Sequence, residues 1–128
     1  LVGDYSITLS AVFRPFIPLA GIDTKWIALT PAGVLTLRDG WANDGPSGPT
    51  VDTPDSIRGA SVHDALYWMI RHGHLPRECR HLADLEFHRI LLQSGMSHER
   101  ARVWYEGVEH FAASAIELSA DIPVLTAP

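Results

Sequence analysis

The pattern of apolar and polar residues changes near residue 55. Before that point Tyr5–Leu9 alternates with a period of two, and Trp26–Leu29 and Val34–Leu37 are short apolar runs, which is typical of strands. Thr30–Gly33 separates the last two runs and predicts a β-hairpin with a four-residue turn. Residues 38–55 show little periodicity and contain four Gly and Pro residues between 45 and 49, which predicts a structured loop or a long connection.

After residue 55 the apolar positions recur with the period of a helix. The spacing predicts helices over about 56–72, from Pro76 to about 93, and from the N-cap Ser97 to about 115. Gly73 and Gly95 are expected to end the first two. The expected inward faces are Ala60, His63, Leu66, Tyr67 and Ile70; Cys79, Ala83, Phe87, Ile90 and Leu91; and Ala101, Trp104, Tyr105, Val108, Phe111, Ala112 and Ala115. Residues 116–128 have no clear period and are expected to form an extended tail.

These elements predict one α+β domain over residues 1–128. A small antiparallel β-sheet in the N-terminal half, with its loops over 1–55, is followed by a three-helix bundle over 56–115 and by the tail. The short connections between the helices predict that neighbouring helices are antiparallel.

Composition narrows the function classes. The formal net charge of −5 argues against general nucleic-acid binding, which needs many Lys and Arg side chains to replace phosphate counterions. No apolar run approaches the roughly 20 residues of a membrane-spanning helix, and no signal peptide is recognisable. The single cysteine, Cys79, excludes an internal disulfide and a Cys-rich zinc site, and we interpret it as a core residue.

The dyad His63-Asp64 is the first candidate for chemistry. His63 shares the apolar face of the first predicted helix, whereas Asp64 is rotated from it by about 100°, to the margin of that face. A buried histidine needs a partner for each ring nitrogen, and metals and carboxylates both serve. A core histidine bonded to a backbone carbonyl is the alternative without function.

Three further residues could complete a site. Asp84 lies beside the apolar stripe of the second helix, and His88 follows four residues later, a spacing that can clamp a metal or form a surface pair. Asp44 belongs to the Gly/Pro-rich loop, where its carboxylate could cap backbone amides or project into a cleft. The sequence thus predicts His63, Asp64, Asp84 and His88 as metal ligands, or Asp44, His63, Asp64 and Asp84 as catalytic groups.

The order of these motifs resembles a known family. A Trp-x-Asn-Asp-Gly-Pro-Ser-Gly-Pro loop is followed by Ser-Val-His-Asp-Ala-Leu-Tyr, then Ala-Asp-x-x-Phe, then an aromatic helix with Trp-Tyr-x-x-Val. Over roughly residues 5–113 this resembles a family of small phage and prophage proteins catalogued as domain of unknown function 1353. The resemblance carries over onto Asp44, His63, Asp64 and Asp84 but not onto His88. It implies a phage-encoded protein in the host cytoplasm or the virion, and no established activity.

Two function classes follow. The first is a hydrolase-like protein, acting on a phosphoester or a cell-wall bond, with a divalent metal (Zn, Mn or Mg) or an acid–base site. The second is a non-enzymatic virion component or assembly factor, in which the same residues form a buried polar network and the partners are phage structural proteins or further copies of the chain. If the His and Asp side chains bond one another without an open position, the second class is favoured.

Overall fold

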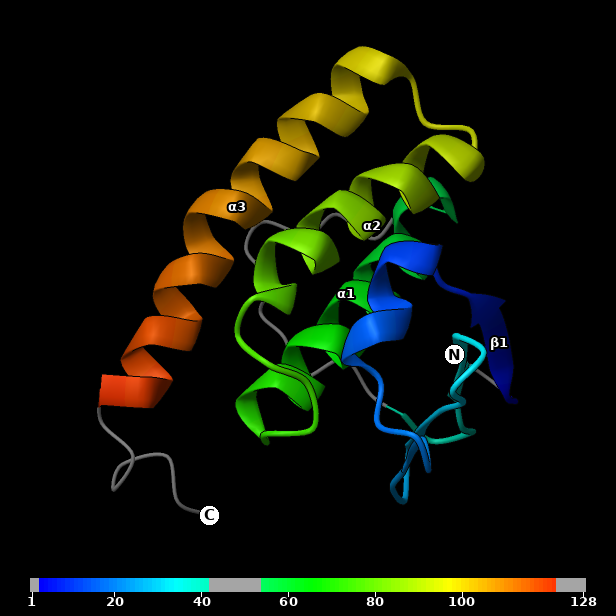
Figure 1. Cartoon of the computed structure of the whole chain (residues 1–128). Helices are drawn as coiled ribbons and strands as arrows, with labels where there is room; N and C mark the ends of the chain where they lie inside the picture. The colour runs from blue at the N-terminus through cyan, green and yellow to red at the C-terminus, as the bar shows by residue number, and fades with distance from the viewer. Residues whose placement is uncertain (1–2, 42–53, 122–128) are drawn as a thin grey trace.

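The computed structural model describes residues 3–41 and 54–121 and has an α+β fold (Figure 1). Four strands, β1 (Tyr5–Thr8), β2 (Ile22–Asp23), β3 (Ile27–Leu29) and β4 (Val34–Leu37), form one sheet in the order β1-β4-β3-β2. All neighbouring strands are antiparallel. The predicted small sheet and its hairpin over residues 30–33 are therefore confirmed, and β2, with two residues, is a strand that the pattern did not predict.

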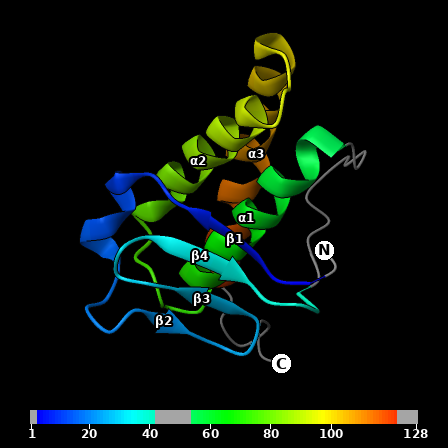
Figure 2. The same ribbon diagram turned by 90° about the vertical axis from the view of Figure 1, so that its right-hand side faces the viewer.

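The register of the sheet places its apolar residues on one face. Tyr5 and Ile27 both pair with Leu37, and Ile7 and Leu29 both pair with Leu35. On the opposite face the Ser6 and Thr36 hydroxyls lie 2.8 Å apart, where solvent reaches them. Because side chains alternate along a strand, one face of this sheet is apolar and packs on the helices that lie behind it in Figure 2.

A short 3-10 helix, η1 (Ala11–Phe16), follows β1 and was not predicted. Pro15 lies inside it, and the Phe13 side chain is fully buried beneath it. Six residues with one buried aromatic give too weak a periodic signal to be recognised in the sequence, although they fix how the N-terminal segment meets the helices.

The three helices are α1 (Pro54–Arg71), α2 (Cys79–Gln93) and α3 (His98–Asp121). Gly73 and Gly95 follow the first two with positive φ angles of 78° and 99°, as helix C-caps require. The expected start of α2 at Pro76 is wrong by three residues, because residues 76–78 first form a turn, in which Cys79 N–H donates to the Pro76 carbonyl.

The expected extended tail from residue 116 is also wrong over its first part. Helix α3 continues to Asp121, since residues 116–121 are mostly good helix formers and the first proline comes at 123. Residues 122–128 lie outside the described part of the chain.

The interior consists of two clusters of buried apolar side chains. The larger one joins the sheet, η1, α1 and α2 as far as Ile90. The smaller one is centred on Phe87, Leu91, Met96 and Ala101 and holds α3. Helices α1 and α2 come close at Gly59, where a Cβ atom would lie 3.1 Å from carbon atoms of both Phe87 and Leu91.

Candidate functional site

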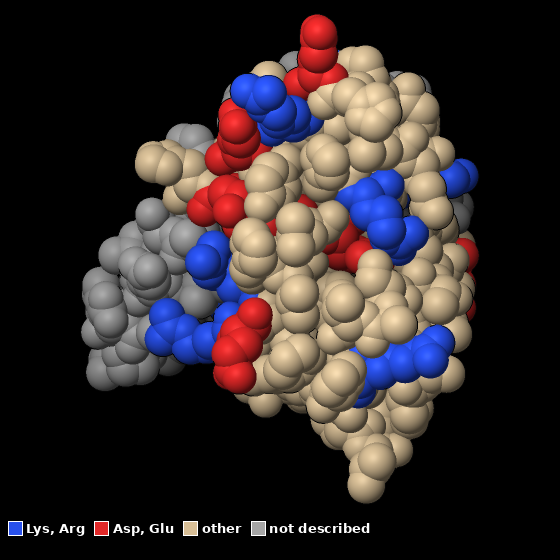
Figure 3. All heavy atoms as spheres, turned by 45° about the horizontal axis from the view of Figure 1, so that its top comes forward, with Lys and Arg blue, Asp and Glu red and all other residues tan. Residues whose placement is uncertain are grey.

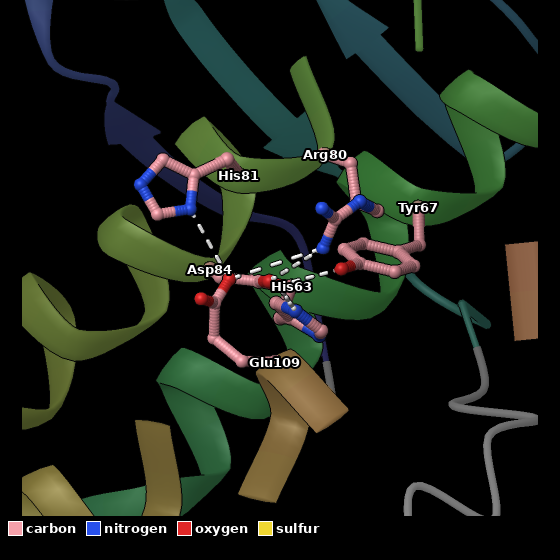
Figure 4. Close-up of polar contacts among 6 residues, drawn as sticks. All are labelled: His63, Tyr67, Arg80, His81, Asp84 and Glu109. Atoms are coloured by element: carbon pink, nitrogen blue, oxygen red, sulfur yellow. Dashed lines mark hydrogen bonds and ion pairs between the residues drawn. The ribbon is translucent and has the colours of Figure 1, made fainter. Parts of the chain in front are cut away.

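The side chain of Asp84 is the centre of a polar cluster to which all three helices contribute (Figure 4). It is 0% exposed, and its Oδ1 accepts a hydrogen bond of 2.7 Å from His63 Nε2 and one of 2.6 Å from the Tyr67 hydroxyl. The imidazole is itself 4% exposed. Three polar groups are thus buried together, and two of them hydrogen-bond to the same oxygen of the third.

Helical geometry explains why these groups meet. His63 and Tyr67 are separated by one turn of α1, so both project from the face that α1 turns toward α2. Their ring centroids are 4.3 Å apart, and the ring of Phe87 from α2 lies 5.2 Å from that of His63. The two donors are therefore held by aromatic packing in addition to the bonds they make with Asp84.

The protonation states follow from this arrangement. Burial by itself raises the pKa of Asp84, but the hydrogen bonds from His63 and Tyr67 outweigh burial and hold this pKa below its usual range. An ionised carboxylate only accepts hydrogen bonds, so Nε2 of His63 carries the proton of the shared bond. Burial, followed by the bond to Asp84, raises the pKa of Tyr67, which stays a hydroxyl at neutral pH.

The cluster reaches solvent between α2 and α3. Arg80 Nη1 lies 3.6 Å from Asp84 Oδ2 and 3.9 Å from Glu109 Oε2, and His81 Nδ1 is 3.2 Å from the same Glu109 oxygen. Exposure rises from 34% for Arg80 and 31% for Glu109 to 54% for His81. The buried carboxylate is therefore connected through Arg80 and Glu109 to a partly exposed polar edge.

The structure brings together two of the five predicted residues, His63 and Asp84. Asp64 is half-buried at the margin of α1, as its rotation from His63 predicts. His88 is half-buried, and its ring meets the Tyr105 ring edge-on with the centroids 5.6 Å apart. His88 therefore packs against α3. Asp44 lies outside the described residues.

The contact between His63 and Asp84 is a direct hydrogen bond. Two ligands of one tetrahedral zinc ion, each about 2.0–2.2 Å from the metal, are separated by more than about 3 Å. His63 Nε2 and Asp84 Oδ1 lie 2.7 Å apart, which is closer than two ligands of one zinc ion would be. Within residues 3–41 and 54–121, no group of three or more His, Cys, Asp or Glu side chains is arranged to hold a metal ion.

A second buried carboxylate on α2 was missed in the sequence. Glu86 is 2% exposed and accepts hydrogen bonds from the Ser10 backbone N–H at 3.1 Å, from the Ser10 hydroxyl at 2.6 Å and from Arg89. Arg89 also reaches the Thr8 carbonyl at 3.4 Å. This network joins the start of η1 and the end of β1 to α2, and its chemistry is that of a structural anchor.

Sequence reasoning also missed the roles of Tyr67, Arg80, His81 and Glu109. Two spacings could have indicated some of them, because His63 and Tyr67, like Arg80 and Asp84, are four residues apart on one helix. Glu109 follows Tyr105 by one turn of α3 and lies beside its apolar stripe. No spacing within one helix could indicate that Glu109 meets Arg80 and His81.

Comparisons with known proteins give no match for this chain among family models, curated proteins or solved structures. In the part of the chain that the structure describes, no helix has the length and apolarity needed to cross a membrane.

Proposed function

We propose that this chain is a non-enzymatic interaction or assembly protein of phage origin. In this proposal the His63–Asp84 network fixes the helices that present its binding surfaces. The observation that carries the proposal is the burial of the network: Asp84 is 0% exposed, His63 is 4% exposed, and Asp84 Oδ1 accepts hydrogen bonds from both His63 and Tyr67. The phage origin rests on the resemblance of the motifs in residues 5–113.

A catalytic base has to come within about 2.6–3.2 Å of the proton that it removes. Nε2 of His63 is engaged by Asp84, and the imidazole has almost no surface that a substrate could touch while α3 is docked. Buried side chains that hydrogen-bond across two helices favour one arrangement of those helices. The geometry therefore supports a fold-fixing role for His63, Tyr67 and Asp84.

The surface carries charged and apolar side chains that a binding partner could contact. On the face shown in Figure 3, acidic and basic side chains are interspersed around a broad uncharged area, and neither sign of charge forms a large patch. Large apolar side chains are exposed at several places, with Val12 at 55%, Leu85 at 45% and Val103 at 67%. Such a surface suits a protein partner or a further copy of the chain better than a polyanion.

The test compares the purified chain with His63→Gln and Asp84→Asn. We expect both variants to unfold at lower denaturant concentration, and we expect no hydrolysis of phosphodiester or cell-wall substrates by the original chain. Analytical ultracentrifugation should show a mass that rises with concentration, or a stable complex with phage structural proteins. Turnover that His63→Gln abolishes while the fold is retained would contradict the proposal, as would a monomer that joins no phage protein.

An acid–base hydrolase is the second candidate, and the polar edge at Arg80, His81 and Glu109 favours it. Groups with shifted pKa values that form a cluster open to solvent on one side are typical of active sites. In this candidate Asp84 orients His63, and α3 has to move before a substrate reaches the imidazole. The same substrate panel decides between the two candidates.

A further inference from the structure

Helix α3 is attached to the rest of the molecule by a hydrophobic cluster of its own. The larger cluster, which includes the sheet, η1 and most of α1, contains no side chain from the described part of α3. The smaller cluster holds α3 through Ala101, with Trp104 and Val108 partly buried against it. Figure 1 shows α3 lying along one side of α2, away from the sheet.

The burial of α3 is shallow. Among its described side chains, residues 98–110, Ala101 alone is buried, whereas Trp104, Tyr105, Val108 and Glu109 are half-buried. In α2, by contrast, Cys79, Ala83, Asp84, Glu86, Phe87, Ile90 and Leu91 are all buried. Segments with few buried apolar contacts open at a lower free energy than the core.

A second set of contacts joins α3 to α2 at the polar cluster. Glu109 Oε2 is 3.2 Å from His81 Nδ1 and 3.9 Å from Arg80 Nη1, and the same Arg80 nitrogen is 3.6 Å from Asp84 Oδ2. Tyr105, one turn earlier, also lies close enough to Asp84 for its charge to raise the pKa of that tyrosine, in addition to burial and to Glu109. Glu109 and Tyr105 of α3 therefore lie at the partly exposed edge of the polar cluster, next to Arg80.

We propose that α3 is a removable cover, which separates from α2 as a unit while the sheet, α1 and α2 stay folded. Its departure opens the buried His63–Asp84 pair to solvent and uncovers the apolar surface at Phe87 and Leu91. The contacts of Glu109 with Arg80 and His81 set how often this opening occurs. This inference does not depend on the proposed function, because both an exchange of helices with a partner and the entry of a substrate would use the same movement.

Hydrogen exchange followed by mass spectrometry on the full chain tests the opening. We expect amides of residues 102–110 to exchange through an opening that leaves those of α1 and α2 protected. Glu109→Ala should speed exchange in α3 by about fivefold, the effect of losing one weak ion pair with Arg80 and one surface hydrogen bond with His81. Glu106→Ala is the matched control, because Glu106 pairs with Arg102 at 3.5 Å on the exposed side of the same helix.

Modification of His63 by diethyl pyrocarbonate, located by mass spectrometry, reports whether the opening reaches the buried pair. The rate at His63 should rise with the exchange rate of α3 in Glu109→Ala and stay at the original level in Glu106→Ala. The proposal is overturned if α3 exchanges only together with α1 and α2. It is also overturned if His63 remains protected when α3 exchange is faster, since α3 would then not be what covers the pair.

Discussion

Asp84 and Glu86 lie two residues apart on α2, are 0% and 2% exposed, and are held in different ways. Glu86 accepts two hydrogen bonds from Ser10 and is neutralised by Arg89, three residues along the same helix. Asp84 accepts hydrogen bonds from the His63 ring and the Tyr67 hydroxyl of another helix, and the nearest arginine nitrogen, Arg80 Nη1, is 3.6 Å away. Two acids on one helix thus anchor the element that packs beside each of them, and only Glu86 has an arginine within hydrogen-bond distance.

The largest expected effect is that of Asp84→Ala. The buried His63 N–H and Tyr67 hydroxyl then have no carboxylate to accept their hydrogen bonds. Removing one partner of a buried pair costs about 3–5 kcal/mol of the free energy of unfolding. Urea unfolding followed by circular dichroism measures the loss. Asp84→Asn retains an acceptor oxygen and should lose less, which keeps the test usable if the alanine variant does not fold. A loss below about 1 kcal/mol in Asp84→Ala would show that the pair is not holding the helices.

Glu86→Ala should cost somewhat less, about 2–3 kcal/mol, because Arg89 can turn to solvent while Ser10 loses its acceptor. The damage should be local, so hydrogen exchange is expected to accelerate in residues 10–16 more than in α3. Glu86→Gln serves as the control of similar size. Unchanged protection of residues 10–16 would contradict the anchoring role of Glu86.

Alkaline pH should weaken the Asp84 network and leave the Glu86 network unchanged, because a tyrosine donates a hydrogen bond in the Asp84 network alone. The pKa of Tyr67 is raised on folding, so its stabilising contribution is complete below the unfolded value of about 10 and is lost as pH rises above it. The free energy of unfolding, measured from pH 8 to 11, should fall less steeply in Tyr67→Phe than in the original chain. Equal slopes would show that Tyr67 does not contribute to this pH dependence.

Acid should act through Asp84 with the opposite sign. Its pKa is lowered on folding, so the stabilisation is present above the unfolded value of about 3.9 and is lost as pH falls through the lower folded value. Between pH 5 and 2 the original chain should therefore lose more stability than Asp84→Asn, which has no carboxylate to protonate at this position. A parallel loss in both chains would assign acid unfolding to other groups.

The two arginines should give the smallest effects. Arg89→Ala removes hydrogen bonds to a buried carboxylate and should cost about 1 kcal/mol, reduced by the partial exposure of the guanidinium. Arg80→Ala removes an ion pair at 3.6 Å that is not a hydrogen bond and should cost about 0.5 kcal/mol or less. Thermal unfolding of both variants measures the difference. The reverse order would show that Asp84, too, is held mainly by charge.

Local patterns predicted much of the fold. The period-two alternation of β1, the hairpin at residues 30–33 and the buried stripe Cys79, Ala83, Phe87, Ile90 and Leu91 depend on neighbours within a few residues. The pattern also placed His63 inward. It put Asp84 beside the stripe of α2, whereas the side chain is completely buried and hydrogen-bonded to His63 and Tyr67 of α1.

Glu86 could not be predicted, because its partner Ser10 is 76 positions away. Periodicity shows that a residue faces the interior, but it does not show which distant group will meet it there. The same holds for Glu109, whose contacts with Arg80 and His81 exist only once α3 has packed along α2.

The bond between Ser10 and Glu86 also has a consequence for the order of events during synthesis. The strands of the sheet all precede residue 38, so a ribosome completes them well before it adds Glu86. Until α2 emerges, the start of η1 has no carboxylate to accept its Ser10 N–H and hydroxyl. Contacts between segments so far apart in the chain form late, because closing the long intervening loop costs entropy first. The apolar face of the sheet therefore stays uncovered until the helices that follow have been synthesised.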